Sequence, residues 1–306
     1  MISFIDEYRD HFGVEFICQT LQQHREGGFI SSRGYRQSKS RGPSARALRD
    51  AELVEMIHQI HEENYGVYGV RKMWHALVRA GIRIGREQTG RLMHLAGVSG
   101  KSKGKSPVTT RKATTVDTRP DLVKRDFQAS GPNRLWVADI TYVRTIKGFV
   151  YAAFVTDAFS RKIVGWALSD SMRTEALPLQ ALNQAIALAK ESTGLVHHAD
   201  HGSQYVSLVY NDTLAEAGIT PSTGTVGDSY DNALAENVNG SYKNELIHTR
   251  RWADVIEVEI ATFQWVTWWN EARLHQGLGY RTPCEVEADY WTHNPTQEII
   301  KNRVNA

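Results

Sequence analysis

Three acidic residues stand at positions from which their carboxylates could act together. Asp139 lies in the middle of the apolar segment WVADITYV, Asp200 closes the segment LVHHAD, and Glu236 lies in a predicted helix that begins near Ala233. Clustered carboxylates repel one another and lose hydration when buried, so they are stable together chiefly when hard divalent cations neutralise them. Oxygen ligands favour Mg²⁺, with Mn²⁺ as a substitute, and two such ions can promote displacement at a phosphodiester. The three acids therefore predict a two-metal site for phosphoryl chemistry.

The helix that carries Glu236 offers a further clue. Asn232 precedes Glu236 by four residues, and Asn239 and Lys243 follow it by three and seven, so all four residues share one helix face. If Glu236 is a metal ligand, Lys243 is expected to bind a phosphate of DNA beside the metals. The alternative is that Glu236 and Lys243 are ordinary surface residues of an amphipathic helix.

Three other acids compete for the role of metal ligand. Asp228 and Asp231 lie in the loop GTVGDSYDN, where carboxylates usually cap helices or form turns. Asp157, at the end of a predicted strand, has the same turn interpretation. We therefore favour structural roles for all three.

Three histidines, His197, His198 and His201, crowd around the second acid of the set and could suggest a zinc site. Structural zinc sites usually include cysteines, but the chain has only two, Cys18 and Cys284, far from these histidines in sequence. We interpret the histidines as phosphate, water or packing contacts. Two cysteines are also too few for a disulfide framework, which favours a reducing cytosol.

The elements that must position the acids begin at Leu135. Three successive strands joined by short turns are predicted over 135–143, 149–159 and 162–169. Next come a helix capped by Thr174, a strand at 195–200, a helix at 207–218, a short strand near Ile219 and a helix from 233 to about 247. A crossover strand added to the first edge of a meander lies beside its first strand, which would bring Asp200 next to Asp139. We therefore expect an α/β fold with a mixed sheet flanked by helices.

Ahead of this region, three helices with glycine turns predict a helix-turn-helix module. The first begins at Ser44, a suitable N-cap, and its inner face carries Leu48, Leu53, Met56, Ile57 and Ile60. The second and third helices, 70–81 and 86–97, end at glycines.

Positive charge is concentrated in and after this module. Between residues 66 and 125, fourteen Lys and Arg residues stand against three acids, an excess of eleven in a chain of net charge +2. A recognition helix presents basic side chains to base edges and phosphates, so the candidate DNA contacts are Arg71, Lys72, Arg83, Arg86 and Arg91. The alternative is a small helical bundle with a basic surface. Because the basic flank continues through KSKGKSPVTTRKATT, we favour DNA.

These patterns divide the chain into five segments: an N-terminal helical attachment element over 1–43, the helix-turn-helix DNA-binding domain over 44–100, a basic linker over 101–130, the catalytic domain over 131–250 and a C-terminal helical extension over 251–306. A Gly, Ser and Arg-rich connection is expected to follow the one or two helices of residues 1–25.

The C-terminal extension is rich in aromatic residues. The segment FQWVTWWN places Phe263, Trp265, Trp268 and Trp269 on a helix, with core packing expected and base stacking as the alternative. Arg273 and His275 follow in a predicted loop and are candidates for DNA contact.

The first twenty residues carry four acids instead of a basic stretch and an apolar run, so they do not predict a signal peptide. No apolar stretch approaches the ~20 residues that a membrane-spanning helix needs. We therefore expect a cytoplasmic, nucleoid-associated protein without a membrane partner.

The segments WVADITYV, HHADHGSQY and GDSYDNALAENVNGSYKNEL resemble the three signature blocks of DDE transposases and retroviral integrases, with thirty-five residues between the second and third acids. The blocks FIDEYR and GVEFICQTL, the helix-turn-helix block from Tyr65 to Val98 and the tail WWNEARLHQGLGYRTPCE resemble the OrfB-type transposases of the IS-three insertion sequences. The resemblance covers nearly the whole chain, although the zinc domain of retroviral integrases has no counterpart here.

This resemblance implies an RNase H-like catalytic core with a five-stranded mixed sheet, preceded by an all-α helix-turn-helix module. It implies that Asp139, Asp200 and Glu236 are the catalytic metal ligands for two Mg²⁺ ions and that Lys243 matches the family's basic residue. It further implies double-stranded DNA substrates, namely transposon-end inverted repeats and target DNA, with metal-dependent strand cleavage and strand transfer. A homo-oligomer on DNA and fusion with, or binding to, the upstream OrfA product are also implied.

Two other functions compete with transposition. A DNA-binding regulator could use the helix-turn-helix module alone, but the intact set of three acids argues against it. A structure-selective nuclease with the same core would have no need of the long N-terminal module.

Overall fold

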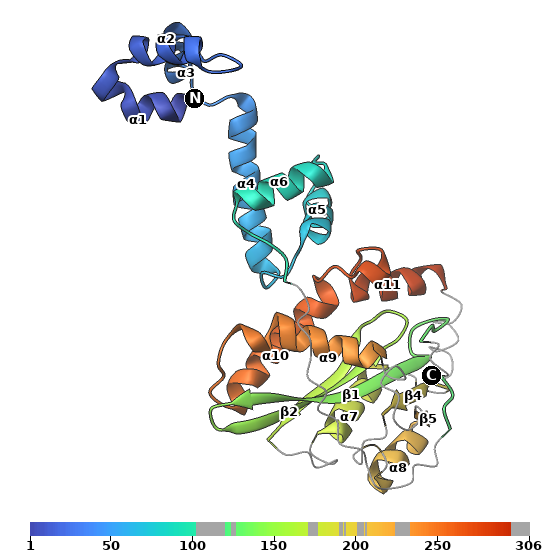
Figure 1. Ribbon diagram of the computed structural model, residues 1–306. Helices are drawn as coiled ribbons and strands as arrows, with labels where there is room; N and C mark the ends of the chain where they lie inside the picture. Colours follow the sequence, from blue (N-terminus) through green and yellow to red (C-terminus); the bar gives the residue numbers. More distant parts are fainter. Residues whose placement is uncertain are drawn as a thin grey trace. The chain divides into compact units, whose positions relative to one another are not determined.

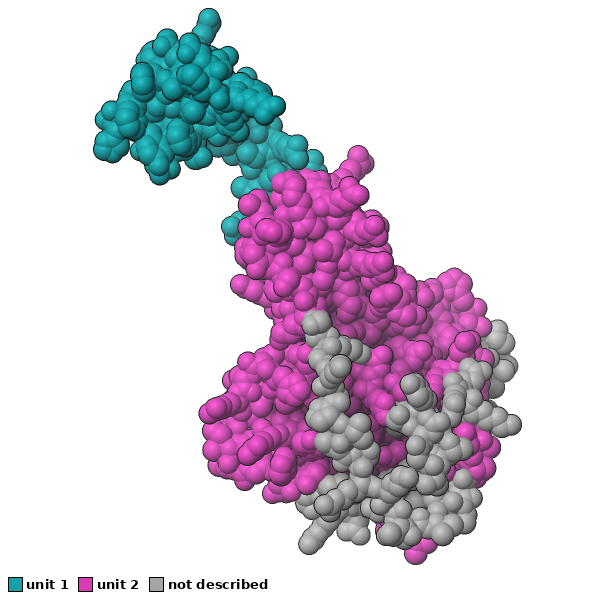
Figure 2. Space-filling model, viewed as in Figure 1, with its two compact units in different colours: residues 1–56 teal, residues 57–306 magenta. Residues whose placement is uncertain are grey.

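The computed structural model describes residues 1–101, 120–123, 127–170, 177–189, 192, 194–200, 205, 207–223 and 233–294. The chain divides into two compact units, Met1–Met56 and Ile57–Ala306 (Figure 2). Several predictions concern residues outside the described ones: the Thr174 cap, His201, Asp228, Asp231, Asn232 and most of the basic linker.

The first unit begins with three short helices, α1 (Ile2–Phe12), α2 (Val14–His24) and α3 (Ser32–Ser40). The sequence predicts a connection without helix after residue 25, and this prediction was wrong for Ser32–Ser40, which form α3. Ser31 caps this helix by accepting a hydrogen bond from the Gly34 backbone N–H at 3.1 Å. Tyr35 then anchors α3, because its ring is buried with Ile5 and its hydroxyl donates to Asp6 Oδ1 at 2.6 Å. A single apolar residue in a polar helix leaves no periodic pattern to detect.

The predicted helix-turn-helix elements are present as α4 (Ala45–Glu63), α5 (Val70–Arg79) and α6 (Arg86–Leu95). The Ser44 cap is confirmed, since its hydroxyl accepts from the Ala47 backbone N–H at 3.2 Å. Gly81 and Gly97 follow α5 and α6 with φ values of 81° and 68°, a left-handed conformation that favours glycine. The expected inner position of Leu48 was wrong, because this side chain is 53% exposed.

Residues 135–223 form one five-stranded sheet in the order β3-β2-β1-β4-β5. Its strands are β1 (Leu135–Thr145), β2 (Gly148–Asp157), β3 (Ile163–Ser169), β4 (Val196–Ala199) and β5 (Thr220–Thr223). The first three form an antiparallel meander, and β4 pairs with β1 in parallel. The predicted mixed sheet and the predicted pairing of the first and fourth strands are both confirmed.

Helices cover the sheet on both faces (Figure 1). They are α7 (Pro178–Ala189), α8 (Leu208–Glu216), α9 (Ala233–Glu245) and α10 (Val255–Glu271), and α11 (Pro283–His293) packs against α10. Short 3₁₀ turns lie at Ile247–Thr249 and Gln276–Leu278. The helix α7 packs closely on β3, where a Cβ atom on Gly165 would lie 2.1 Å from the Ala181 carbonyl oxygen. Glycine is therefore required at this crossing. In the described part of the chain, no helix has both the length and the apolar composition needed to cross a lipid bilayer.

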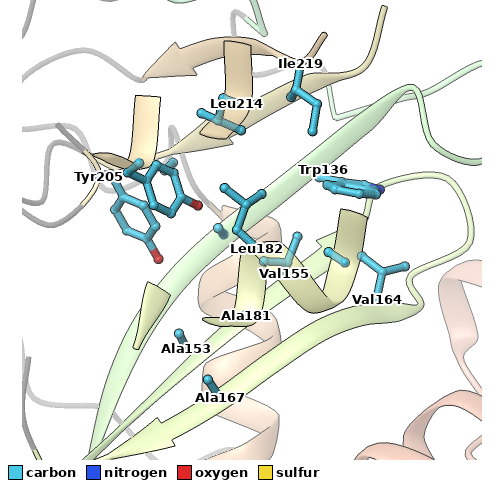
Figure 3. Packing of buried hydrophobic residues seen from close by; sticks show 14 of the residues in the cluster. Trp136, Ala153, Val155, Val164, Ala167, Ala181, Leu182, Tyr205, Leu214 and Ile219 are labelled. Carbon is cyan, nitrogen blue, oxygen red and sulfur yellow. The ribbon is translucent and has the colours of Figure 1, made fainter. Parts of the chain in front are cut away.

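Strand alternation decides which side chains of β1 face α7 and which face α9. Trp136 and Ala138 belong to the buried hydrophobic cluster between the sheet and α7, together with Val155 and Leu182 (Figure 3). Asp139 therefore points to the opposite face. Its partner in the β1–β2 register is Phe154, and this residue contacts the rings of Tyr242 on α9 and Trp265 on α10.

The tryptophans of α10 pack into this second layer, as predicted. Trp265, Trp268 and Trp269 are buried. The same expectation was wrong for Phe263, which is 62% exposed. A helix has two sides, and the sequence pattern alone did not show which aromatic residue faces outward.

Candidate active site

Backbone pairing brings the first two acids side by side. In the parallel register of β1 and β4, Ala138 is opposite Ala199. Asp139 follows Ala138 on β1, and Asp200 follows Ala199 at the end of β4. Neighbouring strands lie about 4.8 Å apart, so these two acids occupy adjacent positions at the end of β4.

The carboxylate of Asp139 is held by two hydrogen bonds. Its Oδ1 accepts from the Ile140 backbone N–H at 2.8 Å, and its Oδ2 accepts from Asn239 Nδ2 at 2.8 Å. Asn239 lies on α9 and is 8% exposed. This contact ties the helix that carries Glu236 to the central strand.

Electrostatics show that the three acids lie within reach of one another. Burial and then the charge of Asp200 raise the pKa of Asp139 to about 8, with a smaller contribution from Glu236. Partial burial and the charge of Asp200 also raise the pKa of Glu236. Both shifts arise from burial and like charge, which a bound divalent cation would offset.

The donor atoms of this site fit hard divalent cations. Asp139, Asp200 and Glu236 supply only carboxylate oxygens, the ligand type that such ions prefer. Within the described residues, however, no three Asp, Glu, His or Cys side chains lie as a ready-made set of ligands. The Asp139 oxygens instead accept hydrogen bonds from the Ile140 backbone and from Asn239.

Lys243 lies two helical turns beyond Glu236 on α9. Its Nζ lies 4.5 Å from the centre of the Tyr142 ring on β1. This ring therefore orients a cation on the α9 face that also carries Asn239. No local sequence pattern predicts this contact between Lys243 and Tyr142.

The remaining acid and histidines of the region have structural contacts. Asp157 is 1% exposed, and its carboxylate accepts from the Ser160 backbone N–H and hydroxyl, each at 2.7 Å, which confirms its turn role. His197 and His198 are buried, and they are hydrogen-bonded to the Tyr210 hydroxyl and the Ser222 hydroxyl, both at 3.0 Å. The packing interpretation holds for these two histidines.

The proposed DNA contacts of Arg273 and His275 were wrong. Both side chains are buried, at 8% and 7% exposure, and Arg273 forms an ion pair with Glu245 at 2.5 Å. Burial, followed by the charge of Arg273, lowers the pKa of His275 to about 2, so this ring is neutral. Glu245 and Arg273 are far apart in sequence, and no local pattern predicts such a pair.

Four of the five basic residues suggested for the helix-turn-helix module, Arg71, Arg83, Arg86 and Arg91, are exposed. The fifth, Lys72, is partly buried, and its Nζ lies 5.2 Å from the centre of the Tyr68 ring. Arg86 and Arg91 are on α6, with Arg86 at its first position.

Family models match three stretches of the chain. They are an integrase core domain over residues 129–229, a second integrase core domain over residues 217–283 and an HTH-like domain over residues 47–106. Among solved structures, the HTLV-2 integrase catalytic core domain in complex with magnesium (trimeric form) aligns with 52% of this chain and 99% of its own, at 19% identity and a TM-score of 0.42.

Full-length relatives agree with these domains. The transposase for insertion sequence element IS629 of Shigella sonnei is 45% identical over 293 residues, which are 95% of this chain and 97% of the relative. A putative transposase for insertion sequence element IS986/IS6110 of Mycobacterium tuberculosis (strain CDC 1551 / Oshkosh) is 49% identical over 258 residues, 82% of this chain and 92% of the relative. With an HTH-like domain ahead of an integrase core on a five-stranded mixed sheet, this chain belongs to the family of insertion-sequence transposases.

Proposed function

We propose that this transposase cuts a phosphodiester bond at the end of its insertion sequence and joins the freed 3′-hydroxyl to a strand of target DNA. Asp139, Asp200 and Glu236 are the proposed catalytic carboxylates. One observation carries the proposal: Asp139 and Asp200 follow paired residues of β1 and β4, and Asn239 ties α9, the helix that carries Glu236, to Asp139.

The three carboxylates would hold two divalent cations, Mg²⁺ with Mn²⁺ as a substitute. Such ions, when bound, supply Lewis acids for the attacking and leaving oxygens of a phosphodiester. Asn239 is a positioning residue in this scheme, because its amide N–H orients Oδ2 of Asp139. Lys243 binds a DNA phosphate, since its ammonium lies on the same helix face and is oriented by Tyr142.

The HTH-like domain is the proposed reader of the terminal inverted repeats. Arg71, Arg83, Arg86 and Arg91 expose guanidinium groups, which bind phosphates and guanine edges. Lys72 adds positive charge to α5 beside them. The five segments predicted from the sequence, 1–43, 44–100, 101–130, 131–250 and 251–306, remain our proposed domain boundaries.

The assembly follows from the chemistry. An insertion sequence has two ends, so we propose a homo-oligomer that holds both ends and the target DNA. The upstream OrfA product, fused or bound to this chain, is the proposed additional partner. The expected location is the nucleoid in the bacterial cytoplasm.

Strand cleavage and strand transfer on DNA that carries the terminal inverted repeat test this function. Asp139→Asn, Asp200→Asn and Glu236→Gln keep the side-chain shape but remove the charge that holds cations, so each variant should lose both activities while it still folds. Asp228→Asn and Asp231→Asn are the matched controls. They neutralise acids that the sequence assigns to a loop, and they should leave cleavage at the wild-type level.

Three results would contradict parts of this proposal. Near-normal cleavage by any one of the three variants would remove that residue from the catalytic set. Loss of cleavage in a control variant, with wild-type DNA affinity, would identify a further essential acid in the loop. Cleavage without joining of the 3′ end would reduce the protein to a nuclease.

A further inference from the structure

A buried arginine closes the far end of the helix that carries Glu236. Arg273 donates from Nε to Glu245 Oε1 and Oε2 at 3.2 and 3.0 Å, and from Nη2 to Oε1 at 2.5 Å. Glu245 is the last residue of α9. The guanidinium carbon of Arg273 also lies 4.3 Å from the centre of the Trp269 ring, and its Nη1 lies 3.2 Å from His275 Nδ1. The C-terminal end of α9 is thus locked to the segment after α10.

The same segment is held from the other side by the HTH-like domain. Tyr68, just ahead of α5, is 1% exposed, and its hydroxyl accepts a hydrogen bond from the Leu274 backbone N–H at 2.8 Å. The Lys72 ammonium on α5 lies 5.2 Å from the centre of the Tyr68 ring. One hydroxyl therefore links α5, which we propose to contact DNA, to the residue that follows Arg273. We call Tyr68, Glu245, Arg273 and Leu274 the junction.

Two further contacts join residues of the HTH-like domain to the C-terminal segment. The Trp268 indole N–H donates to Asn64 Oδ1 at 3.0 Å. His75 stacks on Tyr280, with ring centres 3.7 Å apart and an interplanar angle of 19°. Tyr280 has a φ of 62°, a conformation rarely adopted by bulky residues and kept only where the surroundings require it.

A buried ion pair is a poor device for stability alone. Replacing such a pair by apolar residues is often neutral or stabilising, because removing two charges from water offsets their attraction. Its distinctive property is geometry, since a planar guanidinium forms several directional hydrogen bonds at once. The four-point contact of Arg273 with Glu245 and His275 therefore specifies the position of α9 more than it stabilises the fold.

We propose that the junction sets the distance between the DNA-binding helices and the catalytic carboxylates, and so determines which phosphodiester is cut. Tyr68 and Arg273 are positioning residues in this scheme, and neither touches the reacting atoms. The inference rests on the proposed function. It predicts that loosening the junction changes where DNA is cut without changing how tightly the DNA is bound.

The test compares Tyr68→Phe and Arg273→Lys in the full chain, with Mg²⁺ and a duplex that carries the terminal inverted repeat. Tyr68→Phe removes only the hydroxyl that accepts from Leu274, whereas Arg273→Lys keeps the charge but loses the planar fork. The matched control is Tyr35→Phe, which removes a tyrosine hydroxyl bonded to Asp6 at 2.6 Å in the other compact unit. Cut positions are read at single-nucleotide resolution, and DNA affinity is measured by fluorescence anisotropy.

Both junction variants should bind the duplex like the wild type. Cleavage at the wild-type phosphodiester should fall by about ten- to a hundredfold, the cost expected for a misplacement near 1 Å, and new cuts should appear one or two nucleotides away. The Tyr35→Phe control should cut only at the wild-type position.

The outcomes separate this inference from the function on which it rests. If the wild type does not cut the end duplex, the proposed function fails and the junction proposal fails with it. If Tyr68→Phe cuts only at the phosphodiester that the wild type cuts, whether faster or slower, the junction is merely structural and the inference is overturned. Should Arg273→Lys not fold, Tyr68→Phe alone decides.

Discussion

Neutralising Asp139 should stabilise the protein in the absence of divalent cations. The pKa of this carboxyl rises from 3.8 to about 8 on folding, because burial and the charge of Asp200 disfavour the ionised form. At pH 7 the unfolded chain would ionise the group while the folded chain keeps it mostly protonated, which costs about 4 kcal/mol at 1.36 kcal/mol per pKa unit. Asp139→Asn removes this cost.

The gain is partly offset by lost hydrogen bonds. The carboxylate accepts from both the Ile140 backbone N–H and Asn239 Nδ2, whereas an asparagine side chain offers one acceptor oxygen. Leaving one donor unpaired costs about 1–3 kcal/mol, so the net gain should be about 2 kcal/mol. For a unit of this size that corresponds to a Tm higher by about 4–8 °C.

The pH dependence has a definite sign. A raised carboxyl pKa means that the folded state binds more protons, so wild-type stability should fall as pH rises from about 4 to about 8 and then level off. Asp139→Asn should lack this contribution, so its advantage should shrink as pH falls and reverse near pH 4, where only the lost hydrogen bond separates the two proteins.

Melting curves in EDTA at pH 4, 6 and 8, repeated with Mg²⁺, provide the assay. Mg²⁺ should raise the wild-type Tm and have little effect on Asp139→Asn, by binding linkage. The reasoning is refuted if the variant melts below the wild type at pH 8 in EDTA, or if the difference between the two proteins does not change with pH.

Three further predictions concern the basic residues and the junction. Arg86→Ala and Arg91→Ala in the full chain should weaken DNA binding and reduce the slope of log affinity against log salt by about one each; an unchanged slope in anisotropy titrations would contradict the proposed phosphate contacts. Lys243→Ala should raise the DNA concentration needed for half-maximal cleavage while the Mg²⁺ requirement stays the same, and Lys243→Arg should recover most of the loss; rescue by excess Mg²⁺ alone would argue against a phosphate contact. Arg273→Met leaves the Glu245 charge buried and unpaired, so urea denaturation should show a loss of about 3–5 kcal/mol. Most of that loss should return in the double variant Arg273→Met/Glu245→Gln, and a double variant no more stable than Arg273→Met would show that lost packing, not the orphaned charge, is the cause.

The sequence by itself determined the order of elements and the three acids of the candidate site. Periodicity located β1 to β5 and the helices between them, because alternation and the 3.6-residue repeat are local properties of the chain. Strand chirality and connectivity then placed the fourth strand beside the first. Asp139 stood out because an apolar strand has no local reason to carry a carboxylate.

Only the tertiary structure decided how the remaining polar groups are used. Arg273 and Glu245 are separated by 28 positions and pair only because α9 and α10 pack on one face of the sheet. The sequence around Arg273 is compatible with a solvent-exposed loop, which is why the predicted DNA contact was wrong. Asn239 could be placed on the face of Glu236 from helix geometry, but its bond to Asp139 depends on where α9 docks. Local patterns fix which face a side chain occupies, whereas its partner is set by packing between elements far apart in the chain.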